Sequence, residues 1–278
     1  MQSVQGGDDM SVCAYCERDG LLTREHLFLE FLARRSPGYG TYIDHSRPST
    51  PLRAVPVIRD VCAKCNNERL GKLDAYATRL TEKFFVFLAG EPFHVKLECD
   101  SDRLLRWLLK LLYNDARATS GGAIEIYRDL RPFILGGEPN LPFPIHLLAG
   151  IIAPAKLSAG RDDLDYPEHH GFSDIFLQPP LRDWVVLSRG IFLNSYFFYV
   201  LGWRKGIPRP TRRRTLAKLA EIQALVELPR PVCSVEITKA FADTKALMYG
   251  TFAGGFALEP GKGVSAFHPP LKRQRGAR

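Results

Sequence analysis

Two C-x-x-C pairs constrain the fold of this chain more than any other feature of its sequence. The pairs are Cys13–Cys16 and Cys62–Cys65, with 45 residues between them. Both thiolates of such a turn can reach one ion, and two turns complete a tetrahedral set of sulfur ligands. One pair alone would fit buried thiols or a redox pair equally well, whereas two pairs in a small hydrophilic region favour a metal. We therefore predict a structural zinc ion held by Cys13, Cys16, Cys62 and Cys65, with no position open for water.

The two remaining cysteines, Cys99 and Cys233, are isolated in the sequence. Six cysteines in 278 residues are too few for a disulfide framework. We expect Cys99 and Cys233 to be small, buried apolar residues.

A second group of polar residues lies between the two pairs and directly after them. Thr23-Arg24-Glu25-His26 follows the first pair, and Asn66-Asn67 follows the second. Together with the cysteines, this pattern resembles the cysteine-containing branch of the HNH endonuclease family. His26 lies ten positions after Cys16, which is the usual offset in that family. The resemblance covers about residues 13–80, under a third of the chain.

The resemblance implies a ββα-metal fold, in which the catalytic His lies on a hairpin and an Asn begins the following helix. Glu25 and Asn66 would each supply one oxygen ligand to a catalytic divalent ion, Mg²⁺ or Mn²⁺, because such hard cations prefer oxygen. His26 would act as the general base, since an unperturbed pKa of about 6.5 suits proton transfer near neutrality. Asp74 is also common in similar sequences, but the sequence assigns it no role.

The same residues also admit structural roles, and the chain departs from the family pattern. His26 can be a packing residue, Glu25 can pair with a neighbouring arginine, and Asn66 can cap a helix. Many family members place an Asn nine residues before the last motif residue, where it holds the catalytic His loop; here that position is Val57. A second acid–histidine pair, Asp44-His45, is an alternative to Glu25-His26.

The geometry of a strand adds one requirement. Adjacent strand residues point to opposite faces, so Glu25 and His26 can share a site only if the strand is locally irregular.

Helical and strand patterns organise the rest of the chain. Leucine and alanine recur every three or four residues after Ala63, which predicts a helix there. A break near Gly90 separates two expected domains, an HNH-type zinc domain over 1–90 and a larger α+β domain over 91–278. The predicted fold class is therefore α+β. In the second domain we expect helices over 102–118 and 215–226, and strands over 145–152, 184–187 and 191–201.

The charge of the chain favours a polyanionic partner. The net charge is +8, and residues 81–278 hold 27 Lys and Arg against 20 Asp and Glu. We predict that the densest basic cluster contacts nucleic-acid phosphates; a solvated helix start would explain it equally well. A second basic cluster lies over 272–278. The densest cluster contains Arg212, Arg213, Arg214 and Lys218.

The sequence gives no sign of a membrane segment. No stretch approaches the roughly 20 apolar residues that span a bilayer. The polar, acidic residues 1–10 do not resemble a secretory signal. We therefore expect a soluble, cytoplasmic protein without a membrane partner.

These features together predict a metal-dependent endonuclease that hydrolyses the phosphodiester bonds of DNA. DNA is favoured over RNA, although no residue separates the two. The second domain would bind nucleic acid or regulate the first. The alternative is a non-catalytic zinc module that binds nucleic acid or a protein partner, and Val57 in place of the usual Asn keeps it open.

Overall fold

The structure, a computed structural model, has a mixed α+β fold with a four-cysteine cluster near its N-terminus. Asp44-His45 and the basic residues 272–278 lie outside the residues that it describes. The described residues are 11–27, 31, 42–43, 57–86, 88, 94–118, 124–152, 155–159, 162–166, 170–177, 179–241, 256–257 and 265–267.

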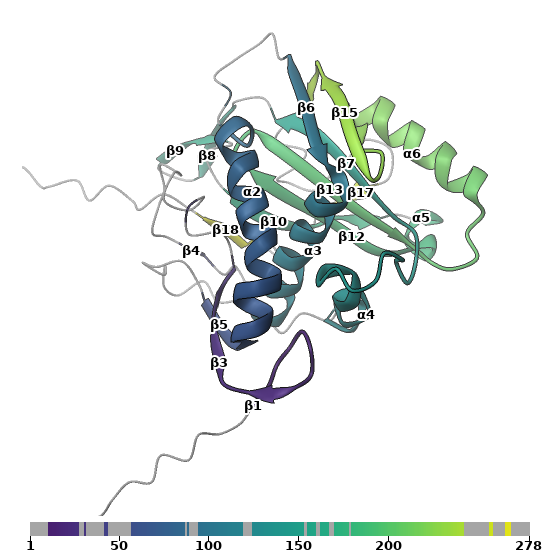
Figure 1. The fold of residues 1–278 in the computed structure, drawn as a ribbon. Coiled ribbons are helices and arrows are strands. Elements are labelled where there is room, and N and C mark those ends of the chain that lie inside the picture. Colours follow the sequence, from purple (N-terminus) through teal and green to yellow (C-terminus); the bar gives the residue numbers. More distant parts are fainter. Residues whose placement is uncertain are drawn as a thin grey trace, which may run out of the picture.

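The centre of the fold is an eight-stranded, mostly antiparallel sheet (Figure 1). Its order is β14-β7-β13-β12-β10-β18-β4, and β16 adds to the same edge of β7 as β14, in parallel. The strands are β4 (Tyr42–Ile43), β7 (Ile145–Ile152), β10 (His170–Asp174), β12 (Val185–Leu193), β13 (Tyr196–Trp203), β14 (Val226–Glu227), β16 (Ala240–Phe241) and β18 (Ser265–Phe267).

The hairpin of β12 and β13 covers the two strands that the sequence predicts over 184–187 and 191–201, but its turn lies inside the second of them. Leu193 pairs with Tyr196, so the turn consists of Asn194 and Ser195. Asn194 has a φ of 53°, in the left-handed region that Asn tolerates. Its Nδ2 donates to the carbonyl of Phe85 at 2.7 Å. The residues of this run are buried as predicted, but the chain reverses because the polar pair at its centre favours a turn.

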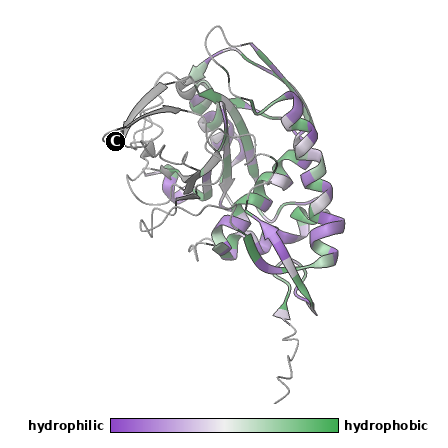
Figure 2. Cartoon of the chain, turned by 90° about the vertical axis from the view of Figure 1, so that its left-hand side faces the viewer, coloured by the Kyte–Doolittle hydropathy of each residue, from purple (hydrophilic) through white to green (hydrophobic). Residues whose placement is uncertain are grey.

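Helices cover both faces of the sheet, which explains why β13 is apolar along its whole length. Tyr196, Phe198 and Val200 pack in one buried cluster with α3 (Ser101–Ala118), together with α2 (Gly71–Lys83) and α4 (Ile124–Ile134). The alternate residues of β13 pack in a second cluster with α6 (Arg209–Gln223) and α5 (Leu181–Trp184). Figure 2 shows hydrophobic residues concentrated in the central strands, beside helices of mixed colour.

The predicted helix over 102–118 is confirmed as α3, and the strand over 145–152 as β7. Among the described residues, no helix combines the length and the apolar character needed to cross a bilayer.

The N-terminal segment folds as two paired strands followed by a helix. A short hairpin of β1 (Ser11–Val12) and β2 (Asp19–Gly20) carries the first cysteine pair. β3 (Leu22–His26) then pairs with β5 (Val57–Cys62) in antiparallel register. A π-helical segment, η1 (Lys64–Leu70), continues directly into α2, and Figure 1 shows β3 and β5 at the lower end of that helix.

A separate two-stranded sheet brings the two isolated cysteines together. β6 (Val95–Asp100) pairs with β15 (Val232–Ile237), and Cys99 lies opposite Cys233. Both side chains are buried, as predicted, and their Sγ atoms are 2.8 Å apart. Their proximity follows from strand pairing across 134 residues, which the sequence does not reveal. Two further pairs complete the fold, β8 (Ala155–Ala159) with β9 (Asp162–Tyr166), and β11 (Phe176–Leu177) with β17 (Phe256–Ala257).

The helix α6 begins at Arg209, six residues before the start that the sequence predicts. Pro208 is extended, and Pro210 lies in the first turn, where its missing N–H costs no hydrogen bond. Arg212, Arg213 and Arg214 therefore belong to the first turns of a helix.

One buried cluster crosses the expected domain boundary at residue 90. It contains Tyr15 and Val61 from the cysteine region, and Trp107 and Tyr113 from α3. The N-terminal segment therefore shares its core with α3, and the division into domains over 1–90 and 91–278 stays a prediction.

Candidate metal centre and active site

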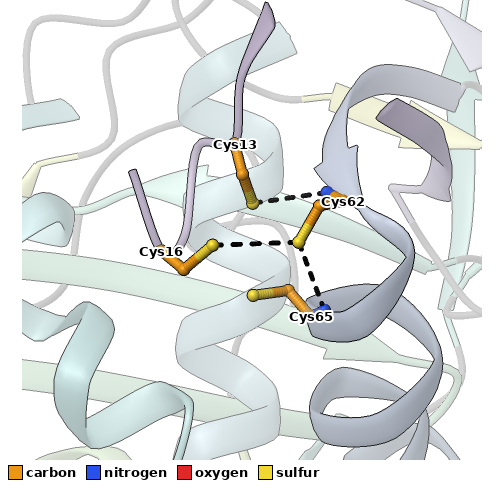
Figure 3. A group of neighbouring side chains, drawn as sticks. All are labelled: Cys13, Cys16, Cys62 and Cys65. Carbon is orange, nitrogen blue, oxygen red and sulfur yellow. Dashed lines mark hydrogen bonds between the residues drawn. The ribbon is translucent and has the colours of Figure 1, made fainter. Parts of the chain in front are cut away.

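The four cysteines gather at the junction of the β1–β2 hairpin, the end of β5 and the start of η1. Figure 3 shows their sulfur atoms directed toward a common centre. All four Sγ atoms lie within 4.8 Å of one another, and those of Cys16 and Cys62 are 3.8 Å apart. Four sulfurs at a Zn–S distance of about 2.3 Å would stand about 3.8 Å apart at the corners of a tetrahedron. The cluster can therefore bind a metal ion such as zinc.

Backbone N–H groups donate hydrogen bonds to two of the four cysteine sulfurs. The N–H of Cys62 donates to Cys13 Sγ at 3.3 Å, and the N–H of Cys65 donates to Cys62 Sγ at 3.5 Å. Burial raises the pKa of Cys13, but hydrogen bonds from the backbone N–H groups of Cys62, Cys16 and Tyr15 outweigh it and lower the pKa to about 7. Burial raises the pKa of Cys65. A cation at the centre would favour the thiolate form of all four, because metal ligation releases thiol protons.

The β3–β5 hairpin carries Glu25 and His26 next to this cluster. The register shifts between Thr23 and Glu25, so the strand is irregular directly before the predicted site. Glu25 and His26 themselves pair regularly, with Ile58 and Val57. Regular pairing sends their side chains to opposite faces, and Glu25 is buried whereas His26 is half-buried. A shared site for both side chains would need the irregularity between Glu25 and His26. It lies instead between Thr23 and Glu25.

Asn66 ties the start of the helix to the strand that carries His26. Its Nδ2 donates to Thr23 Oγ1 at 2.9 Å and to the carbonyl oxygen of Arg24 at 2.8 Å. Because a carbonyl can only accept, the nitrogen of the amide must face the strand. The Oδ1 atom then has no hydrogen bond from a described residue, and a carbonyl oxygen of this kind suits a hard divalent cation.

Glu25 belongs to a buried charge cluster with Lys110 and Asp74. Lys110 Nζ lies 2.6 Å from Glu25 Oε1 and 2.7 Å from both carboxylate oxygens of Asp74. The Trp107 indole N–H also donates to Asp74 Oδ1, at 3.2 Å. Two carboxylates for one ammonium leave one formal negative charge, and Glu25 Oε2 has no hydrogen bond to a described residue. Asp74, for which the sequence gives no role, therefore helps to hold a lysine against the hairpin.

Asn114 of α3 holds the backbone at His26. Its Nδ2 donates to the carbonyl oxygen of His26 at 3.0 Å and to Glu25 Oε1 at 3.2 Å. Its Oδ1 accepts from the Tyr15 hydroxyl at 2.9 Å and from Arg117. The Nδ1 atom of His26 is buried and has no hydrogen-bond partner in the described part of the chain. Asn114 thus fixes the strand at His26 from a distant helix.

Sequence reasoning missed Lys110 and Asn114, although both carry a signal. Lys110 stands between Leu109 and Leu111 in the middle of an apolar helix, where an unpaired charge is costly. Asn114 lies one turn further on the same buried face. A polar residue inside an apolar run predicts a buried partner, but the sequence does not say which one.

The basic cluster predicted to contact nucleic acid lies elsewhere in the fold. Arg212, Arg213, Arg214 and Lys218 belong to α6, which packs on the opposite face of the sheet from α3. Arg212 and Arg213 line a hollow with His146, Arg209 and Glu227. The structure therefore does not bring this cluster together with the hairpin residues.

Comparison with known proteins identifies no relative. No protein-family model matches the chain, and no curated protein or solved structure matches it.

Proposed function

We propose that this chain is a metal-dependent endonuclease of the HNH type, with His26 as general base and a divalent ion held by Glu25 and Asn66. One observation carries the proposal. The order of β3, β5 and a helix, joined at a four-cysteine cluster, places His26 on the first strand and Asn66 in the first turn of the helix, with the amide of Asn66 bonded to that strand. This arrangement supports the ββα-metal expectation.

The proposed reaction is hydrolysis of a phosphodiester bond in DNA. His26 accepts a proton from water while the water oxygen forms a bond to phosphorus and the bond to the leaving oxygen breaks. A bound Mg²⁺ or Mn²⁺ would act as a Lewis acid that stabilises the charge on the phosphate oxygens. Asn66 Oδ1 and Glu25 Oε2 are the oxygens available for it, since Asn66 Nδ2 and Glu25 Oε1 already bond to protein groups. The cysteine cluster would hold a structural zinc ion that keeps the hairpin and the helix together.

The test is nicking of supercoiled plasmid with Mg²⁺ or Mn²⁺, comparing the wild-type protein with His26→Ala at matched zinc content. We expect a loss of at least about 100-fold in His26→Ala, the usual contribution of general-base catalysis. Equal nicking by the two proteins would refute the proposal.

A second variant separates the two roles open to Glu25. If Glu25 binds the catalytic ion, Glu25→Gln abolishes nicking while zinc content stays that of the wild type. Wild-type nicking with a lower melting temperature would assign Glu25 to the buried cluster with Lys110 alone.

Two observations favour the alternative, a non-catalytic zinc module. Regular pairing at Glu25 and His26 sends their side chains to opposite faces of the strand, whereas the proposed site needs both. The described residues offer no partner that would orient the His26 ring through Nδ1, and Val57 stands opposite His26 in the hairpin. Retained DNA binding with no nicking by the wild-type protein in either metal would support this alternative.

A further inference from the structure

A cleft of about 570 Å³ lies between η1 and α2 on one side and α3 and the segment after α4 on the other. Sites for small molecules are mostly apolar with a few polar groups. This cleft differs from such sites because charged side chains dominate its lining. They are one carboxylate, Glu68, and five cations, Arg69, Lys72, Arg79, Arg103 and Arg106.

Most of these cations lack a counter-charge. Arg103 Nε lies 3.1 Å from Asp100 Oδ2. Within the described part of the chain, the other four cations form no ion pair. By contrast, Arg128 and Arg131 of the neighbouring α4 are paired with glutamates at 2.5 and 2.7 Å. After Glu68 and Asp100 are counted, the cleft keeps three excess positive charges.

Arg106 is fixed in place at the cleft wall. Its Nε donates to the carbonyl oxygen of Ile134, the last residue of α4, at 3.1 Å. Its guanidinium lies so close to Gly136 that a Cβ there would be 2.4 Å from Nη2. Burial lowers the pKa of Arg106, and the charge of Arg103 lowers it further. A bound anion would relieve this repulsion, and the fixed side chain would lose little entropy on binding it.

The cations are spread along the helix. Lys72 and Arg79 are seven residues apart on α2, or about 10 Å at 1.5 Å per residue, which is too far for one phosphate group to contact both. At the other end, Arg69 lies three residues after Asn66, one turn from the proposed active site. A chain of phosphates that fills the cleft would therefore end beside the β3–β5 hairpin.

We propose that this cleft binds the phosphodiester backbone of a nucleic-acid strand and leads it toward the hairpin. The role as a substrate channel rests on the proposed nuclease function, whereas binding itself can be measured separately. The α2–α3 cleft would recognise the charge and spacing of the phosphates and not the base sequence, because its cations would contact phosphates.

The test measures the affinity of a fluorescently labelled oligonucleotide of about 20 nucleotides by anisotropy, without divalent ions, so that cleavage cannot contribute. The test variant is Lys72→Gln/Arg79→Gln. Both residues are exposed on α2, so the substitutions do not disturb the core. The matched control is Arg182→Gln/Lys239→Gln, which removes the same charge from exposed positions outside the cleft. Zinc content and circular dichroism check that both variants fold.

We expect the cleft variant to bind at least about tenfold more weakly, with a salt slope reduced by about 1.4, because each lost phosphate contact on a single strand lowers the slope by about 0.7. The control variant should bind like the wild type. A cleft variant with the wild-type Kd and slope would overturn the proposal. So would a nucleoside monophosphate that binds as tightly as the oligonucleotide, since this would make the cleft a small-ligand site.

Failure of the cleft proposal and failure of the proposed nuclease function give different results. A wild-type protein that never nicks DNA but loses affinity only in the cleft variant supports the cleft and refutes the nuclease. Normal nicking together with unchanged affinity in the cleft variant supports the nuclease and refutes the cleft.

Discussion

Asn114 shows how one residue of a distant helix can fix the backbone of a strand. Its amide nitrogen bonds to the His26 carbonyl and to Glu25, while its oxygen accepts from Tyr15 and Arg117. All its hydrogen-bonding directions are therefore used to hold the hairpin against α3. Buried groups of this kind orient the residues beside them, which under the proposed function are Glu25 and His26.

We predict that Asn114→Ala lowers kcat for plasmid nicking by about 10- to 100-fold, the usual cost of losing such a positioning group. The KM for DNA should change little, because Asn114 is buried and contacts no substrate. The measurement is steady-state nicking at matched zinc content. A rise in KM with unchanged kcat would contradict the positioning role.

Lys110 is a second residue of α3 that contacts the hairpin, through its ion pair with Glu25. Only 2% of its side chain is exposed, yet it carries a charge between two carboxylates. Burial by itself lowers its pKa, but the charges of Asp74 and Glu25 outweigh burial, so the pKa is raised above the ordinary 10.5. Removal of one partner from a buried ion pair is costly, because the others stay buried without compensation.

Lys110→Met should therefore lower the free energy of unfolding by about 3–5 kcal/mol at neutral pH, measured by urea denaturation. Since the pKa of Lys110 is higher in the folded than in the unfolded protein, its contribution is complete below the unfolded value of about 10.4 and disappears as the pH rises through the folded value. The stability difference between wild type and variant should thus stay constant over pH 7–9 and shrink at higher pH, at roughly 1.4 kcal/mol per pH unit at most. A stability difference that grows with pH would show that folding does not raise the pKa of Lys110.

At the scale of elements, the four-cysteine cluster joins three short segments, which α3 also contacts. β1 and β2 are two residues long each, and the β3–β5 hairpin is a two-stranded sheet, which is marginally stable by itself. The cysteine cluster connects this hairpin to the start of η1, and α3 contacts the hairpin as well. Removal of the metal should therefore loosen the hairpin before it disturbs the central sheet.

We predict one zinc ion per chain by elemental analysis and a fall in melting temperature on treatment with a chelator. Cys62→Ser should reduce the zinc content and cause the same loss, because metal-binding free energy contributes to folding. Hydrogen exchange should then increase first in β3 and β5. Unchanged melting of metal-free protein would contradict a structural role for the ion.

At the scale of the whole molecule, the sheet separates two basic regions. The α2–α3 cleft lies on the face covered by α3, and the arginines of α6 lie on the opposite face. The cleft continues from the helix that carries Asn66, whereas α6 has no such connection to the hairpin. Under the proposed function, this placement favours the cleft over the α6 cluster as the surface that leads a substrate to the hairpin. The buried cluster shared by Tyr15 and Trp107 also means that hairpin and sheet depend on each other for stability.

The sequence by itself determined the features that depend on neighbouring residues. Each C-x-x-C turn brings two sulfurs together locally, and the four sulfurs form a cluster that could hold a metal ion. The helix α3 and the strand β7 agree with their predicted ranges because apolar periodicity and β-forming residues act within a short window. The turn at Asn194-Ser195 and both ends of α6, at Arg209 and Gln223, departed from these local predictions. The turn and the early helix start depend on the polar and proline residues between apolar runs.

The tertiary structure alone decided which distant residues serve the candidate site. Lys110 and Asn114 lie more than 80 residues from Glu25 and His26, so no periodic pattern connects them. The cations of the α2–α3 cleft come from two helices that are ordinary charged surfaces in the sequence and become one surface only when packed. Short-range preferences select turns, strands and helices, but the contacts between them arise from burial of the shared core, which depends on the whole chain.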